Sequence, residues 1–309
     1  MSRLNSSIAF VLLVSVFLLS LLFASYQTKD LWIIFFFIVL TTSTSITTIQ
    51  LFKTQALGTK LIEYPKSVLV VVIGALATFY LAKFGMSAVL ASALIGIGGS
   101  LLLKRYEIEI FTGSFVGMSS IVFFTYGGVL AASMIAAVVY LMGKNVFVGI
   151  GGKLGSSAFV GTLIVALLMG IDVYTFEIAF INTALPLWFI VITMIISATA
   201  SVATNQMAQR WFKGSTVLGS SVTGVLGYLL SLSFGGLGGL FAGSIFAASF
   251  AGMSQNKVLK SPQYFMIAGA ITAILFLASS TYFLGLGGKM GTSAFIGVIA
   301  TLIFIKKTT

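Results

Sequence analysis

The chain has 309 residues, of which 59% are hydrophobic and only 7% charged, and it carries a formal net charge of +11 at pH 7. Soluble domains contain about 25% charged residues, so this composition excludes a soluble globular protein. The absence of cysteine and histidine excludes disulfides, thiol chemistry and imidazole acid–base catalysis, and with them haem or zinc ligation by these side chains.

Apolar runs separated by short polar breaks fill the chain. A transmembrane helix needs roughly 20 apolar residues, and several runs are shorter, so broken or re-entrant helices are expected among them. The sequence predicts an all-α polytopic membrane protein with about eleven transmembrane helices. The runs cover residues 8–23, 31–51, 67–81, 88–103, 121–142, 156–170, 187–204, 217–232, 237–250, 265–284 and 292–305.

One motif occurs twice. Residues 149–161 read GIGGKLGSSAFVG and residues 285–297 read GLGGKMGTSAFIG, with near-isosteric exchanges at the four positions that differ. A second pair, GSFVGMS at 113–119 and ASFAGMS at 248–254, has nearly the same offset. Such regular self-similarity indicates an internal duplication. We predict a first repeat at residues 31–170 and a second at residues 185–305, with five spans each.

Residues 1–30 are expected to form an additional N-terminal transmembrane helix. Arg3 and the apolar run after it are also typical of a signal peptide, but the cleavage context near Ala24 is weak, so we expect the segment to be retained. Five spans are an odd number, which would place the two repeats upside down relative to each other, as in many transporters. At the level of architecture this resembles the urea transporters, which are also built from two inverted five-span repeats; no sequence motif of that family carries over.

The basic residues stand in connections between apolar runs, which favours topology signals and lipid headgroups over nucleic acid as their partners. In the predicted topology they divide between the two sides of the membrane, and the second group is favoured as cytoplasmic. The first group is Lys53, Lys60, Lys66, Lys104 and Arg105, and the second is Lys144, Arg210, Lys213, Lys257, Lys260, Lys306 and Lys307.

The repeated glycine-rich motif is the first candidate site. In each copy a lysine precedes Gly-Ser-Ser or Gly-Thr-Ser, which is typical of a capped helix start, and a helix start with a nearby lysine attracts negative groups. We predict a shared solute site that favours a small anion. The alternative is that small residues only pack helices and the lysines extend to the membrane surface. The predicted site residues are Lys153, Gly155, Ser156, Ser157, Lys289, Gly291, Thr292 and Ser293.

The second repeated motif adds Ser114, Phe115, Ser249 and Phe250. Its hydroxyl groups would contact a solute, and its two phenylalanines would form a constriction in a half-length re-entrant helix. Ordinary helix packing is the alternative.

Carboxylates are scarce, and their positions limit the chemistry. All six are expected in connections, and none follows Glu177, which argues against a symmetric proton relay or a carboxylate cation site. Glu107 and Glu109 are expected in a solvated loop beside Lys104 and Arg105, with gating or coupling as the alternative. Backbone carbonyls and the Ser/Thr runs at 41–45 and 197–201 leave a Na⁺ site open. No cofactor, resident metal or catalytic function is predicted.

Together these features predict a membrane transporter or channel in which a small solute, preferably an anion, passes between two inverted repeats. A channel for a small neutral solute such as urea or another amide, or a non-transporting membrane scaffold subunit, are the alternatives. The expected location is a cell membrane, most simply a bacterial inner membrane, crossed many times. The expected partners are the solute and the lipid bilayer, and a homo-oligomer is left open.

Overall fold

The computed structural model describes residues 64–171, 185–280 and 283–305. The runs predicted at 8–23 and 31–51, the N-terminal helix at 1–30 and the Ser/Thr run at 41–45 lie outside the described residues. Within the described part the chain is helical and has no strand, as the sequence predicts.

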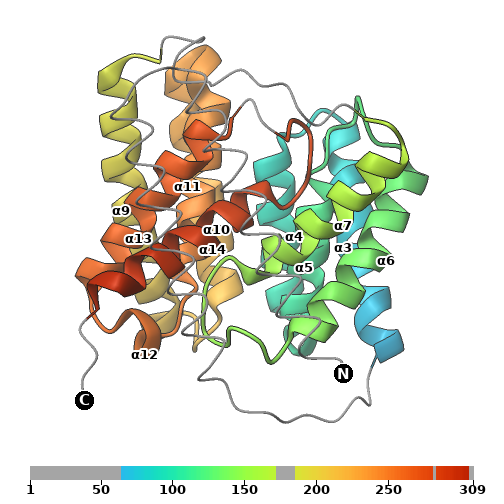
Figure 1. Ribbon diagram of the computed structural model, residues 1–309, viewed down its shortest axis with the longest axis horizontal. Coiled ribbons are helices and arrows are strands. Elements are labelled where there is room, and N and C mark those ends of the chain that lie inside the picture. The colour runs from blue at the N-terminus through green and yellow to red at the C-terminus, as the bar shows by residue number, and fades with distance from the viewer. Residues whose placement is uncertain (1–63, 172–184, 281–282, 306–309) are drawn as a thin grey trace.

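Figure 1 shows two groups of helices side by side. One group consists of α3 (Tyr64–Lys83), α4 (Ala88–Leu102), α5 (Glu107–Gly117), α6 (Tyr126–Gly143) and α7 (Lys153–Leu168). The other consists of α9 (Leu187–Arg210), α10 (Thr216–Ser231), α11 (Gly238–Gly252), α13 (Pro262–Ala278) and α14 (Lys289–Thr301). Short helical turns complete the described chain: η1 (Lys104–Tyr106), η2 (Leu232–Leu237), α12 (Asn256–Leu259) and η3 (Leu302–Phe304).

Four apolar stretches in the described residues are long enough to cross a membrane: Pro65–Lys83, Tyr126–Gly143, Leu187–Arg210 and Thr216–Gly252. The last one contains both α10 and α11, joined through η2, where Gly235 has a φ of 52°. These stretches fit a multi-pass helical membrane protein. The remaining apolar helices, among them α4, α7 and α13, are shorter.

α5 and α11 are the central helices of their groups. α5 packs against α3, α4, α6 and α7, and α11 packs against α9, α10, α13 and α14. Every residue of α5 from Glu109 onward is buried, although we expected its first residues in a connection. Glycine makes the close packing feasible, because a Cβ atom on Gly113 or Gly117 would collide with backbone carbonyl groups of α3. The two groups meet where α4 packs on α10 and α7 packs on α14.

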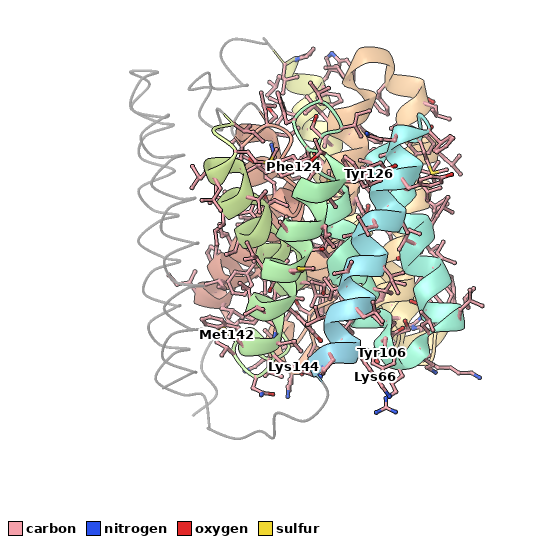
Figure 2. All side chains as sticks on the ribbon, turned by 90° about the vertical axis from the view of Figure 1, so that its right-hand side faces the viewer. Lys66, Tyr106, Phe124, Tyr126, Met142 and Lys144 are labelled. Carbon is pink, nitrogen blue, oxygen red and sulfur yellow. The ribbon has the colours of Figure 1, made fainter. Side chains whose placement is uncertain are left out.

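The basic side chains gather at one end of the helices. Figure 2 shows Lys66, Tyr106 and Lys144 at one end and Phe124 and Tyr126 at the other. Lys144 forms an ion pair with Glu109, and Ser215 donates a hydrogen bond of 2.7 Å to Glu107, so the connections before α5, α7 and α10 share this end.

This arrangement corrects the predicted division of the charges, because Lys144 and the cations before α10 lie at the same end as Lys104 and Arg105. The connection after α11 is at this end too, since Gln255 N donates to Gly149 O. We call it the basic end and define it by Lys66, Lys104, Arg105, Lys144, Arg210, Lys213, Lys257 and Lys260. Lys83 lies at the opposite end, with its ammonium group 4.8 Å from the ring centre of Tyr126.

Candidate functional site

The two copies of the glycine-rich motif meet at the start of α7 and α14. A Cβ atom added to Gly155 would lie 2.6 Å from the Cα atom of Gly291, and one added to Gly152 or Gly288 would collide with the backbone of the facing helix. Only residues without side chains allow this approach. The two motifs hold equivalent positions in the predicted repeats, and in the structure they are in direct contact.

Each glycine-rich loop also docks on the central helix of the other group. Gly151 N donates to the hydroxyl group of Ser254 after α11 (3.0 Å), and Gly287 N donates to the hydroxyl group of Ser119 after α5 (3.2 Å). The two hydrogen bonds join equivalent positions of the two motif pairs. All four repeated segments therefore form one structural unit at the junction of the groups.

The motif hydroxyl groups face their own helices. The N-caps of α7 and α14 are Gly152 and Gly288, with φ of 83° and 87°, so the prediction that serine or threonine caps these helices is wrong. The hydroxyl groups lie one turn inside and donate to backbone carbonyl groups four residues earlier. The residues concerned are Ser156, Ser157, Thr292 and Ser293, and all are fully buried.

The motif lysines hold the ends of the preceding helices. Lys153 Nζ donates to the carbonyl oxygens of Gly143 (3.2 Å), Lys144 (3.0 Å) and Val146 (2.9 Å). Lys289 Nζ donates to Ser279 O (2.9 Å) and lies 5.7 Å from the ring centre of Phe276. A cation at a helix C-terminus complements the dipole and satisfies carbonyl groups that lack intrahelical partners. An ammonium group has three protons to donate, and those of Lys153 have three protein acceptors.

Four phenylalanines form a cluster between the central helices. The ring centres of Phe115 and Phe250 are 4.7 Å apart. Within α5 the ring centres of Phe111 and Phe115 are 4.4 Å apart, and within α11 those of Phe246 and Phe250 are 4.5 Å apart. The neighbouring serines point sideways into helix contacts: Ser114 pairs with Ser92 (2.8 Å) and Ser249 with Ser220 (2.7 Å). We call Phe111, Phe115, Phe246 and Phe250 the phenylalanine cluster.

A cavity of about 370 Å³ lies at the basic end between the two groups. Phe115 and Phe250 line it, together with the backbone of residues 149–152. Its polar side chains are Lys153, Gln209, Thr216, Ser254 and Gln255, and no carboxylate of the described part of the chain lines it. Pockets of this size hold small molecules, with a few polar groups providing orientation.

Of the predicted site residues, Phe115, Lys153 and Phe250 line this cavity. The other residues predicted for the site are absent from its lining: Gly155, Ser156, Ser157, Lys289, Gly291, Thr292, Ser293, Ser114 and Ser249. Sequence reasoning missed Gln209, Thr216 and Gln255 as site residues. Two sequence features could have indicated them: the amide of Gln209 lies shortly after the apolar run at 187–204, and the amide of Gln255 directly follows the repeated motif at 248–254.

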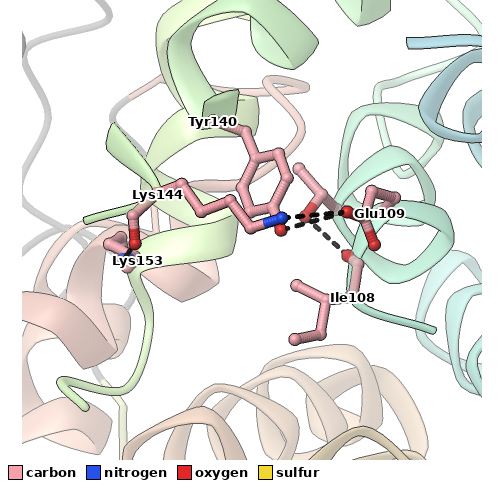
Figure 3. A network of polar contacts seen from close by, with 6 residues as sticks. Ile108, Glu109, Tyr140, Lys144 and Lys153 are labelled. Carbon is pink, nitrogen blue, oxygen red and sulfur yellow. Dashed lines mark hydrogen bonds and ion pairs between the residues drawn. The ribbon is translucent and has the colours of Figure 1, made fainter. Parts of the chain in front are cut away.

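Glu109 lies beside the cavity and is buried. Figure 3 shows Tyr140 and Lys144 converging on its carboxylate. Tyr140 Oη donates to Glu109 Oε1 at 3.4 Å, and Lys144 Nζ is 3.9 Å away from the same oxygen. Only 7% of the Glu109 side chain is accessible, against 57% for Lys144. The expectation of a solvated loop is therefore wrong for this residue.

Replacing Lys153 with methionine is expected to lower stability, because it leaves three carbonyl groups near the end of α6 without their donor. A buried carbonyl left unsatisfied costs about 1–3 kcal/mol; the bonds to Gly143 and Val146 are partly buried and contribute toward this cost, whereas the carbonyl of Lys144 is exposed and can bind water instead. Thermal unfolding of the purified protein in detergent measures the effect, and Lys66→Met, which removes an exposed cation at the same end, is the control. Unchanged stability of Lys153→Met together with a loss of anion flux would instead return this lysine to the role of an anion ligand.

No protein-family model, curated protein or solved structure matches the chain.

Proposed function

We propose that the chain is a membrane transporter or channel for a small, neutral, polar solute that passes between two inverted helical repeats. The observation that carries this proposal is the cavity at the basic end, which lies between the two helix groups and reaches Phe115 and Phe250. A solute entering it would meet amide, hydroxyl and backbone groups first and the phenylalanine cluster next.

Equivalent contacts in the two groups support the repeats. A Cβ atom on Gly99 would collide with Ile110, and one on Gly227 would collide with Ile245 at the equivalent position. Gly96 and Gly224 face Phe111 and Phe246 in the same way. These pairs match α4 with α10 and α5 with α11, and the order of the helices then matches α3 with α9. We therefore propose that the first repeat begins at α3 and not at residue 31.

The direction of the central helices supports inversion. α5 begins at the basic end with Glu107, whereas the residues that follow α11 lie at that end and contact the loop before α7. Two equivalent helices thus run in opposite directions, as inverted repeats require. The excess of cations favours the basic end as the cytoplasmic one.

The lining of the cavity supports a neutral solute over an anion. Among the described residues that line it, the one cationic side chain, Lys153, already donates to three carbonyl groups, so it has no proton left for a solute. The amides of Gln209 and Gln255 and the hydroxyl groups of Thr216 and Ser254 offer both donors and acceptors. Urea and other small amides need such a mixture.

A small anion is the second candidate because the cavity lies at the basic end. Eight lysine and arginine side chains define the basic end, and a cluster of one sign raises the local concentration of oppositely charged solutes.

Proteoliposomes with the purified chain separate these candidates. We expect stopped-flow light scattering to show faster equilibration of urea or formamide than of formate or nitrite, relative to empty liposomes. Faster anion entry that falls with rising salt would favour the second candidate. If no solute equilibrates faster than in empty liposomes, transport is contradicted and a scaffold subunit is favoured.

A further inference from the structure

A separate cavity of about 110 Å³ lies at the basic end, among α9, α12 and the start of α13. It shares no lining residue with the cavity proposed for the solute. Its lining is mostly polar, and no carboxylate of the described part of the chain belongs to it. The polar lining residues are Asn205, Gln206, Asn256, Lys260 and Ser261.

The first helix group has aromatic rings where this cavity lies in the second. A Cβ atom on the last residue of α5 would lie 2.6 Å from Thr78 Cβ, and one on the last residue of α11 would lie 2.8 Å from Thr204 Cβ. The proposed pairing of the two groups therefore matches the next residues, Phe79 and Asn205. Phe79 is fully buried, and its ring lies edge-on to that of Tyr126 at 5.3 Å between centres. Rings thus suffice for packing here, and the fold does not require an amide.

The start of α13 also differs from its counterpart. The offset of the glycine-rich motifs pairs Ser261 with Thr125, and these residues stand directly before α13 and α6. Thr125 Oγ1 accepts a hydrogen bond from Gly128 N at 3.2 Å and so caps α6. Ser261 makes no such bond, although it occupies the N-cap position of α13. Its hydroxyl group therefore stays available to a molecule in the cavity.

Asn205 contributes a buried amide to the cavity. Only 7% of this residue is exposed, and within the described part of the chain its one hydrogen bond runs from Nδ2 to Ser254 O at 3.3 Å. A carboxamide has two N–H donors and an acceptor oxygen. One N–H and the oxygen thus lack a protein partner, and buried polar groups in this condition cost free energy that a bound polar group would recover.

We propose that this cavity binds a phosphate group, carried by an anionic lipid or free in solution. The amide of Asn205, the hydroxyl group of Ser261 and the ammonium group of Lys260 are donors that phosphate oxygens accept. The uncapped start of α13 adds partial positive charge to a site that the cavity and its amides already define. Basic pockets between helices at the cytoplasmic side of a membrane suit anionic headgroups. The site does not depend on the proposed transport function.

Native mass spectrometry of the full chain tests the lipid source. The protein in mild detergent is equilibrated with phosphatidylglycerol or with phosphatidylcholine at the same concentration, and the fraction that retains lipid is measured. We expect preferential retention of phosphatidylglycerol. Lys260→Met and Asn205→Leu should each weaken it roughly tenfold, as the loss of one charge-assisted hydrogen bond does. Lys257→Met removes an exposed cation that does not line the cavity, so this control should bind like the parent protein.

Equilibrium dialysis against labelled inorganic phosphate tests the other source. Phosphate binding that Lys260→Met weakens and Lys257→Met does not would assign the site to free phosphate, whereas lipid retention with this pattern would assign it to a headgroup. Monodisperse elution of each variant in detergent shows that it has folded, and Lys260 is exposed, so its replacement does not disturb the core. Absence of both kinds of binding, or an equal loss in Lys257→Met, would overturn the proposal, because diffuse attraction to the basic end makes no distinction between the two lysines.

Discussion

Replacing Gly155 with alanine is expected to destabilise the protein by a few kcal/mol. The added methyl group would lie 2.6 Å from Gly291 Cα and 3.2 Å from Gly288 O, and both atoms belong to backbone that cannot rotate away. Overpacking of this kind costs about 1–3 kcal/mol where side chains can adjust, and more where they cannot. The two helix groups would have to separate at the crossing of α7 and α14. Thermal unfolding in detergent measures the loss.

Gly98→Ala is the matched control for this prediction. Gly98 lies inside α4, and no atom stands within 4 Å of the position a Cβ atom would take. The same substitution should therefore stabilise the protein slightly, since alanine gains up to about 1 kcal/mol over glycine in a helix interior. Equal losses for Gly98→Ala and Gly155→Ala would show that the contact between the motif copies does not hold the two helix groups together.

The contact between the two glycine-rich motifs could be anticipated from the sequence because glycine has a specific reason to recur. Positions such as Gly155 and Gly291 tolerate nothing larger, so their spacing stays visible in the sequence and correctly directed attention to one region of the fold. The helical class followed in the same direct way from composition. The motif serines and threonines were harder to interpret. A hydroxyl group at the first position of a helix caps it, whereas one placed a single turn later bonds to a carbonyl group inside the helix, and the sequence does not show where the helix begins.

The roles of the charged residues depend on tertiary contacts that no local pattern records. Lys153 has the same sequence context in a solute site as in a helix C-cap, and only the carbonyl groups at the end of α6 distinguish the two. Glu109 belongs to a stretch with three other charged residues, typical of a loop, yet packing of α5 against four helices buries it. Gln209 comes from the end of α9 and reaches the cavity only because the two helix groups meet there.

Replacing Phe250 with alanine is expected to raise solute flux and relax size selectivity. Phe115 and Phe250 line the cavity and contact each other, so a solute following the proposed path between the two helix groups would have to pass these two rings. Removing one ring leaves room for a larger solute. We expect glycerol flux to rise roughly tenfold, as lowering a barrier by ~1.4 kcal/mol does, while urea flux rises less because the smaller solute is less restricted.

The loss of a buried ring also costs stability, typically about 3–5 kcal/mol, so altered flux must be separated from damage to the fold. Phe234→Ala serves this purpose, because Phe234 stacks on Phe241 at 4.0 Å in a separate apolar cluster away from the cavity. Phe250→Leu, which keeps most of the buried volume, should have an intermediate effect on glycerol. Flux ratios of glycerol to urea that are the same in Phe250→Ala, Phe234→Ala and the parent protein would mean that solute does not pass the phenylalanine cluster. A ratio that rises only when Phe250 is shortened requires the path to run between α5 and α11, because these helices carry the two rings.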